Sequence, residues 1–264
     1  MPAPIIHAEH LYTEKPDPGQ FTMHTHETYE IYNFLSGNAK YFVEGNVYRL
    51  RPGDILITKK AEAHSLLFAS DAPYERMFVY FNADALLGTY RESTLPFLDE
   101  RALGKYNHYP ASRFAEYRWS EYFQKICSTT DTEKQRLYLS VLISEMSEQT
   151  HQLQDKEDVK DLMADIIAYI NRHLTESLSL DVLCEKFYIS KSHLNRKFKR
   201  LTGSTVWEYI KTKRLVTAKE LLHSGKHPTA VAIQCGFKEY SAFFYAYKAK
   251  FGVSPKQDFS QNLR

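Results

Sequence analysis

The feature that most limits the fold of this chain is a repeat in its last hundred residues. The segment "VLCEKFYIS" at 182–190 resembles "AVAIQCGFK" at 230–238. The segment "LNRKFKRLTG" at 194–203 resembles "FFYAYKAKFG" at 243–252. A supersecondary unit that occurs twice at such a short interval predicts two equivalent elements on one helical scaffold.

Each copy has the layout of a helix-turn-helix unit. A short first helix carries a small residue where a second helix crosses it, a turn holds an apolar side chain, and a glycine ends the second helix. In the two copies, the small residues are Cys184 and Ala232, the apolar turn residues are Ile189 and Phe237, and the terminal glycines are Gly203 and Gly252. The joining segment "TVWEYIKTKRLVTAKELLHSG" opens with Thr205 and Glu208 at capping-box spacing, so it is expected to form one long helix.

The second helix of the first copy has two unlike faces. Leu194, Phe198 and Leu201 share one side and are expected to be buried. The opposite side carries Ser192, Asn195, Arg196 and Lys199. Arginine and asparagine can read guanine and adenine in the major groove, and lysine pairs with phosphate. A solvated basic helix is the alternative, but duplication of the whole unit favours DNA binding.

Charge is distributed unevenly along the 264 residues. Residues 159–264 hold 18 Lys and Arg against 9 Asp and Glu, whereas residues 1–158 hold 16 against 23. This favours a polyanionic partner for the C-terminal part. The three cysteines are far apart and suggest neither a disulfide framework nor a zinc site, so a cytoplasmic location fits best. We find no signal pattern or membrane-length apolar run and expect no membrane partner.

The first hundred residues predict antiparallel strands. "KYFVEGNVYRLRPGDILITKK" has β-rich runs broken by turn residues, and "ERMFVYF" alternates apolar and polar positions. Helices are expected over 111–126 and after Thr130, which is spaced from Glu133 as a capping box. These helices either cover the strands or pair with a second subunit in a homodimer. The polar stretch 151–158 is expected to be a linker.

The C-terminal strings "SLDVLCEKFYISKSHLNRKFKRLTG", "YIKTKRLVTAKELL" and "CGFKEYSAFFYAYKAKFGVSP" resemble the DNA-binding domain of the AraC/XylS family of transcription regulators. The resemblance covers about residues 160–260. It implies two helix-turn-helix units, about 178–201 and 228–250, that enter successive major grooves of double-stranded DNA. The family's sensor domain implies an N-terminal cupin-like β-barrel with following helices over 1–150, before an all-α domain over 159–264. The expected fold class is therefore α+β multidomain.

The resemblance also places DNA contacts on both reading helices and on the joining helix. The residues carried over are Lys191, Ser192, Asn195, Arg196, Lys199, Arg214, Tyr240, Ser241, Phe244, Tyr245 and Lys248. The chain departs from the family at Tyr245, where a basic residue is usual. It departs again at Asp258-Phe259, where Tyr-Arg usually follows Ser-Pro.

The N-terminal strings "HTHETYEIYNFLSG" and "RPGDILITKKAEAHSL" resemble the cupin-type order of histidine, glutamate and glycine. The resemblance implies an effector pocket that includes His24, His26, Glu30, Tyr32 and His64. In a metal-binding cupin the ligands would be His24, His26, Glu30 and His64. Because no Pro-x-Gly turn precedes His64, we expect no metal and no cofactor.

The sequence thus predicts a sequence-specific transcription regulator that responds to a small-molecule effector, with a sugar as the class favoured by family habit. No catalytic residue is expected, and the chain is expected not to be an enzyme. A metal-dependent cupin enzyme remains an alternative, and a constitutive architectural DNA binder is another.

Overall fold

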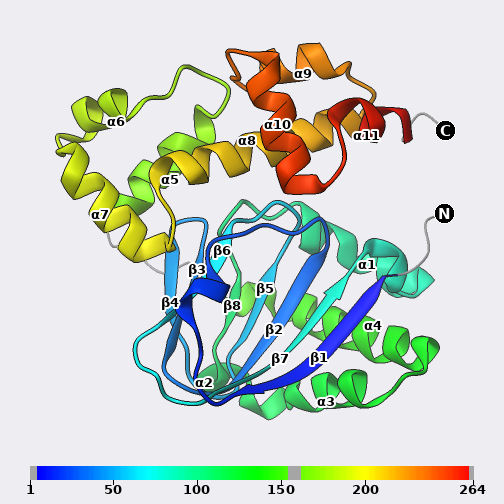
Figure 1. The fold of residues 1–264 in the computed structure, drawn as a ribbon. Coiled ribbons are helices and arrows are strands. Elements are labelled where there is room, and N and C mark those ends of the chain that lie inside the picture. The colour runs from blue at the N-terminus through cyan, green and yellow to red at the C-terminus, as the bar shows by residue number, and fades with distance from the viewer. Residues whose placement is uncertain (1–4, 154–161, 262–264) are drawn as a thin grey trace. The chain divides into compact units, whose positions relative to one another are not determined.

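The computed structural model describes residues 5–153 and 162–261 and divides into two compact units (Figure 1). One unit comprises residues 1–22 and 26–159, and the other comprises residues 23–25 and 160–264. Most of the predicted linker at 151–158 lies outside the described residues. None of the described helices combines the length and apolar character needed to cross a bilayer.

Eight strands of the first unit form two antiparallel sheets (Figure 1). They are β1 (Ile6–Thr13), β2 (Tyr29–Ser36), β3 (Ala39–Val43), β4 (Asn46–Arg49), β5 (Ile55–Thr58), β6 (His64–Phe68), β7 (Tyr74–Phe81) and β8 (His108–Tyr109). One sheet has the order β1-β7-β2-β5-β8, and the other has the order β4-β3-β6. The prediction of an antiparallel cupin-like domain is confirmed, although two sheets replace a closed barrel.

Strand β2 shows how the period of two divides the domain into an apolar layer and a polar site. Tyr29 and Ile31 belong to a core cluster that includes the helices of this unit. Tyr32 and Phe34 belong to a second cluster, formed with β3, β6 and β7. Glu30 shares the face of Tyr32, so its carboxylate is directed away from the helices.

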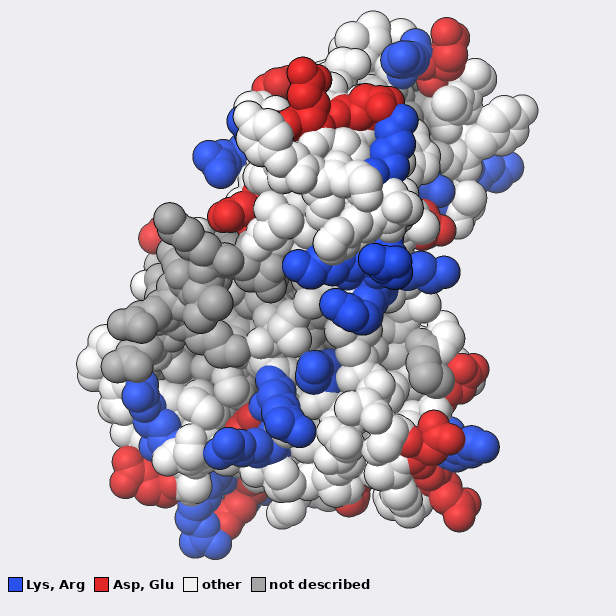
Figure 2. All heavy atoms as spheres, turned by 90° about the vertical axis from the view of Figure 1, so that its left-hand side faces the viewer, with Lys and Arg blue, Asp and Glu red and all other residues white. Residues whose placement is uncertain are grey.

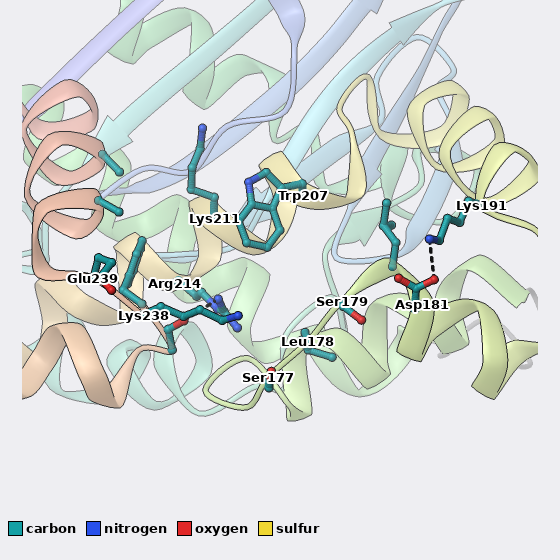
Figure 3. A pocket seen from close by; sticks show the side chains of 15 residues that line it. Ser177, Leu178, Ser179, Asp181, Lys191, Trp207, Lys211, Arg214, Lys238 and Glu239 are labelled. Atoms are coloured by element: carbon teal, nitrogen blue, oxygen red, sulfur yellow. Dashed lines mark hydrogen bonds and ion pairs between the residues drawn. The ribbon is translucent and has the colours of Figure 1, made fainter.

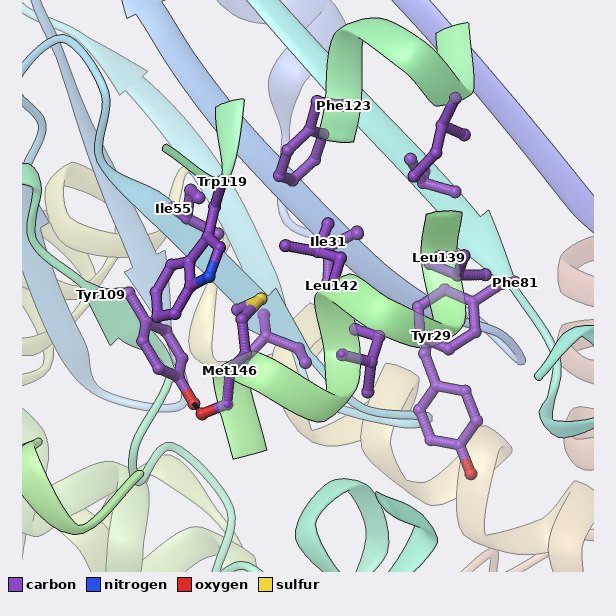
Figure 4. Close-up of a cluster of buried hydrophobic side chains, with 14 of the residues drawn as sticks. Tyr29, Ile31, Ile55, Phe81, Tyr109, Trp119, Phe123, Leu139, Leu142 and Met146 are labelled. Carbon is purple, nitrogen blue, oxygen red and sulfur yellow. Dashed lines mark hydrogen bonds between the residues drawn. The ribbon is translucent and has the colours of Figure 1, made fainter. Parts of the chain in front are cut away.

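The described helices of this unit are α1 (Gly88–Asp99), which precedes β8, and α2 (Ala111–Phe114), α3 (Ser120–Ser128) and α4 (Thr132–Glu148), which follow it. Short 3-10 turns are η1 (Pro18–Phe21), η2 (Ala83–Ala85), η3 (Ala115–Tyr117) and η4 (Thr150–Gln152). Figure 4 shows Phe123 of α3 and Leu139, Leu142 and Met146 of α4 among side chains of the strands. Burial of these residues explains why the helices cover the sheet.

Two local predictions in this region are wrong. The predicted helix over 111–126 is interrupted, because Arg118 adopts a left-handed conformation between η3 and α3. Helix α4 is capped by Asp131 rather than Thr130, since the Asp131 carboxylate accepts hydrogen bonds from the backbone N–H groups of Glu133 and Lys134.

Over residues 162–261, the regular elements of the second unit are helices. Its helices are α5 (Leu162–Arg172), α6 (Leu180–Phe187), α7 (Lys191–Thr202), α8 (Val206–His223), α9 (Pro228–Gln234), α10 (Tyr240–Phe251) and α11 (Pro255–Gln261). Helices α6 and α7 form one helix-turn-helix unit, α9 and α10 form the other, and α8 joins them (Figure 1). The predicted capping box of Thr205 and Glu208 begins α8, and Gly203 and Gly252 end α7 and α10 with left-handed backbones.

Candidate DNA-binding surface and effector site

Helix α7 buries its apolar side and exposes the side predicted to read DNA. Leu194 and Phe198 are buried, whereas Ser192, Arg196 and Lys199 are exposed and Asn195 is partly exposed. The Ser190 hydroxyl accepts a hydrogen bond from the His193 N–H, which fixes the start of the helix. The exposed side chains therefore project from a helix whose other face is anchored.

Helix α10 has the same anchoring but a different outward chemistry. Phe243 and Tyr247 are buried. The predicted contacts Tyr240, Ser241 and Lys248 are exposed, Phe244 is partly buried, and Tyr245 is 72% exposed. Aromatic rings on this face offer apolar contact surface in place of the charge carried by α7.

Arg214 on α8 does not have the exposure that a DNA contact requires. It is 6% exposed, and its guanidinium donates hydrogen bonds to the carbonyls of Leu174 (2.8 Å), Glu176 (2.7 Å) and Gly236 (2.9 Å). The first two acceptors follow α5 and the third lies in the turn between α9 and α10. The prediction that Arg214 contacts DNA therefore disagrees with its placement, which indicates a positioning role.

Gly236 permits this arrangement. Its φ is +76°, and a Cβ atom there would lie 2.9 Å from the Arg214 guanidinium carbon. The absence of a side chain lets the arginine reach the carbonyl of the turn. The joining helix is thereby tied to the loop that precedes α6 and to the turn between α9 and α10.

Asp258 on α11 anchors the end of the chain, a role that the sequence comparison with the family did not predict. Its carboxylate accepts a hydrogen bond from the Tyr247 hydroxyl (2.5 Å) and lies 3.0 Å from Nε2 of His223. Burial alone would raise the pKa of Asp258, but these hydrogen bonds and the Lys219 ammonium lower it. Phe259 packs on the core formed by α8, α9 and α10.

One face of the molecule carries charges of both signs. Figure 2 shows that, on the face it draws, Lys and Arg side chains form local groups interspersed with Asp and Glu.

In the first unit, Glu30 forms the centre of a buried polar cluster. The residue is 5% exposed, and its Oε2 lies 3.0 Å from Nε2 of His64 and 3.5 Å from Nε2 of His26. The Tyr41 hydroxyl is also 3.5 Å from the same oxygen. Burial would raise the pKa of Glu30, but interactions with the two imidazoles hold it below its usual range.

His64 is held in a defined orientation. Its Nδ1 lies 2.8 Å from the backbone carbonyl oxygen of Glu62. A carbonyl only accepts, so Nδ1 carries a proton and Nε2 faces Glu30. Burial alone would lower the pKa of His64, but its interactions with Glu30 raise it. The Tyr41 ring stacks on His64, with 5.8 Å between the ring centroids.

The other predicted effector-site residues lie close to this cluster or next to it in sequence. The ring centroids of His26 and His64 lie 4.8 Å apart, whereas His24 falls in the other compact unit. Tyr32 is buried, and its hydroxyl forms a short hydrogen bond with that of Tyr74. Tyr80, which the sequence did not single out, contributes a ring 4.6 Å from that of His26. His26, Glu30 and His64 belong to one compact unit and form the core of the candidate site.

The donor set also fits a transition-metal ion. Imidazole and carboxylate ligands suit Zn²⁺, Fe²⁺ or Mn²⁺, and metal-bound histidines commonly donate their second N–H to a backbone carbonyl, as His64 does. A metal would need the lone pair of His64 Nε2, so its binding would compete with protonation of that nitrogen, which lies 3.0 Å from Glu30 Oε2.

Two family profiles match these two parts of the chain. A profile described as "AraC-like ligand binding domain" matches residues 8–124, which include the polar cluster. A profile described as "Helix-turn-helix domain" matches residues 183–261, which include α7 and α10. The chain belongs to the AraC/XylS family of transcription regulators. As an AraC-family regulator, it combines a ligand-binding domain with a helix-turn-helix DNA-binding domain.

Several curated relatives of this AraC-family protein are similar along most of their length. The HTH-type transcriptional activator RhaS of Escherichia fergusonii is 24% identical over 254 residues, which cover 90% of this chain and 87% of RhaS. The HTH-type transcriptional activator RhaR of Yersinia pestis is 25% identical, with 92% and 86% covered. The uncharacterized regulator YbfI of Bacillus subtilis is 26% identical, with 90% and 86% covered.

Solved structures also match. ToxT from Vibrio cholerae O395 is 17% identical with a TM-score of 0.38, and 97% of each chain is covered. The DNA-binding domain of AdpA, solved in complex with a target DNA, is 28% identical with a TM-score of 0.37. The match covers 38% of this chain and 92% of the AdpA chain.

Proposed function

We propose that this AraC-family regulator binds two neighbouring DNA half-sites through α7 and α10 and changes its DNA binding when a small molecule occupies the polar cluster around Glu30. The observation that carries the proposal is the repeated anchoring of two reading helices, each with a buried apolar side and an exposed polar or aromatic side. Two such helices suit successive major grooves on one face of a duplex.

The proposed base contacts are Ser192, Asn195 and Arg196 on α7, and Tyr240, Ser241 and Tyr245 on α10. Lys191, Lys199 and Lys248 are proposed to contact phosphates, and Phe244 supports the aromatic face of α10. Arg214 is left out because its guanidinium is buried against three carbonyls.

The proposed effector is a small polar molecule such as a sugar. The carboxylate of Glu30 and the imidazoles of His26 and His64 offer acceptors and donors within a few ångströms. Rings of Tyr41 and Tyr80 beside them offer stacking surface. The effector would act by shifting the population between DNA-competent and DNA-incompetent arrangements, which requires no covalent chemistry.

The cellular role follows from DNA binding. A regulator of chromosomal genes acts in the cytoplasm, and we propose this location for the protein. We also propose that it has no catalytic activity. RhaS and RhaR are named as activators, and we propose activation of transcription as the sign of regulation here. Pairing with a second subunit, which many DNA half-site arrangements use, is part of the same proposal.

The first test is selection of the full-length protein on random duplex DNA followed by sequencing. We expect a site with two half-motifs about one helical turn apart. Recovery of no enriched motif would contradict sequence-specific binding. The enriched duplex then serves to screen sugars and related small molecules for those that alter affinity in the wild type but not in the Glu30→Gln variant.

A metal-dependent activity is a second candidate, and the proximity of His26, Glu30 and His64 supports it. Metal analysis of protein purified without chelators is the direct test. Stoichiometric metal that is lost in the His64→Gln variant would favour this candidate. Metal below one tenth of the protein concentration, in wild type and variant alike, would leave the effector pocket as the function of the cluster.

A further inference from the structure

A pocket of about 640 Å³ lies between the two helix-turn-helix units. Figure 3 shows Trp207 and Lys211 of α8 in its middle, with Lys238 and Glu239 to one side and Asp181 and Lys191 to the other. Lys191 is the first residue of α7, and Glu239 directly precedes α10. The pocket therefore lies between the starts of both reading helices.

The charges around the pocket favour an anion. Its lining contains four basic residues, Lys191, Lys211, Arg214 and Lys238, and two acidic residues, Asp181 and Glu239. Lys191 is paired with Asp181, with 2.5 Å between Nζ and Oδ1. The Arg214 guanidinium already donates hydrogen bonds to the carbonyls of Leu174, Glu176 and Gly236. Apart from Lys191, which is proposed above to contact a phosphate beside α7, Lys211 and Lys238 are then left to attract a ligand.

Lys211 and Lys238 are both exposed. In the described ranges 5–153 and 162–261, Lys238 forms no hydrogen bond or ion pair. Lys211 is attracted electrostatically by Glu208, three residues earlier on α8. Within the same described ranges, the two side chains do not form an ion pair. Their ammonium groups are thus available to neutralise an external negative charge.

The apolar part of the pocket is also exposed. Trp207 is 55% exposed, although tryptophan is usually well buried. Leu178, Phe237, Ala242 and Ala246 line the same space. An exposed aromatic residue flanked by lysines suits a ligand that alternates apolar and anionic groups, as the sugars and phosphates of a nucleic acid strand do.

In the proposed mode of binding, the helical geometry of DNA determines which part of the duplex lies next to this pocket. If α7 and α10 enter successive major grooves, the minor groove faces the protein midway between them, half a helical turn from each. The sugar-phosphate backbone bordering that minor groove must pass the space between the starts of the two helices. This space is the pocket that contains Trp207, Lys211 and Lys238.

We propose that the pocket between the helix-turn-helix units binds the DNA backbone midway between the two half-sites, with Lys211 and Lys238 contacting phosphates and Trp207 packing on deoxyribose. The inference rests on the proposed function, because it requires α7 and α10 to occupy neighbouring major grooves. It adds a sequence-independent contact that fixes the spacing of the half-sites. Glu239 opposes this contact by repelling the same backbone.

The salt dependence of DNA binding measures the phosphate contacts. The slope of log affinity against log salt changes by about 0.9 for each phosphate that a protein neutralises on duplex DNA. We expect Lys211→Gln with Lys238→Gln to reduce the slope by about 1.8, while the preferred sequence stays the same. Glu239→Gln is expected to raise affinity. Lys256→Gln is the matched control, because this exposed lysine of α11 does not line the pocket.

Neutral methylphosphonates placed midway between the half-sites locate the contact. They should weaken binding by the wild-type protein and have little further effect on the Lys211→Gln, Lys238→Gln double variant. Equal sensitivity of both proteins, or no sensitivity of the wild type, would overturn the inference while leaving sequence-specific binding intact. Failure of the wild type to select any sequence would instead refute the proposed function, and this inference with it.

Discussion

Replacing Arg214 by lysine tests whether one buried side chain holds the two helix-turn-helix units in register. Lysine keeps the positive charge but cannot form the planar fork that reaches Leu174, Glu176 and Gly236 together. A hydrogen bond to a charged group contributes about 1.5–3 kcal/mol. If the lysine keeps one of the three bonds, the free energy of unfolding should fall by about 3–6 kcal/mol.

This loss is large for a domain of about one hundred residues. One kcal/mol shifts the melting temperature of such a domain by about 4–8 °C, so the transition of the helical unit should move by more than about 12 °C. Urea unfolding of the full chain, combined with hydrogen exchange of α8 amides, would assign the loss to this unit. DNA binding should weaken and tolerate altered spacing between half-sites, with unchanged base preference within each.

Arg172→Lys is the control for that experiment. Arg172 is exposed and its guanidinium donates a hydrogen bond to the Ala168 carbonyl of its own helix, so its replacement should change stability by no more than about 0.5 kcal/mol. A loss below about 1 kcal/mol for Arg214→Lys would refute the reasoning, because three charged hydrogen bonds would then contribute almost nothing.

Three further predictions concern single side chains. Arg196→Ala should cost about 1–3 kcal/mol of DNA affinity and relax one base position, measured by binding to a panel of single-base variants. Tyr245→Ala should weaken discrimination between thymine and uracil in the second half-site, measured on duplexes with single uracil replacements. The lowered pKa of Asp258 means that it stabilises the fold at neutral pH and that this contribution is lost as the pH falls through its folded-state pKa. Asp258→Asn should therefore lose less stability than wild type between about pH 5 and 3, in thermal melts across that range.

The helical unit was predictable because its signals are local and repeated. The small residues, turn plugs and terminal glycines recur in both copies, so each ambiguous position is supported by its counterpart. The structure adds burial and hydrogen-bond partners, which the spacing of residues in the sequence cannot predict. Arg214 lies at a position where the family usually has arginine, but only its burial and three acceptors separate a positioning residue from a DNA contact.

The N-terminal unit was harder to predict in detail. Alternation identified the strands, but the division into two sheets depends on pairings between residues far apart in sequence. Helix α1 was missed because "GTYRESTLPFLD" contains Pro96 and lacks an apolar stripe. Its Thr94 and Leu98 are nevertheless buried, and tertiary packing overrides the weak local preference. The cluster of His26, Glu30 and His64 was predicted from order alone, yet Tyr80 could be found only in three dimensions.

The two reading helices share anchoring but differ in chemistry, and this asymmetry bears on how the protein would choose DNA. Helix α7 offers Arg196 and Asn195, whose hydrogen bonds distinguish base pairs strongly. Helix α10 offers Tyr240 and Tyr245, whose exposed rings suit thymine methyl groups and the apolar edge of the groove. A protein with one polar and one aromatic recognition helix can tolerate sequence changes in one half-site, while the other half-site fixes the position of the protein on the duplex. In the proposed mode of binding, the hydrogen bonds of Arg214 would make this division effective, because a strongly read first half-site would place α10 at a fixed distance along the duplex.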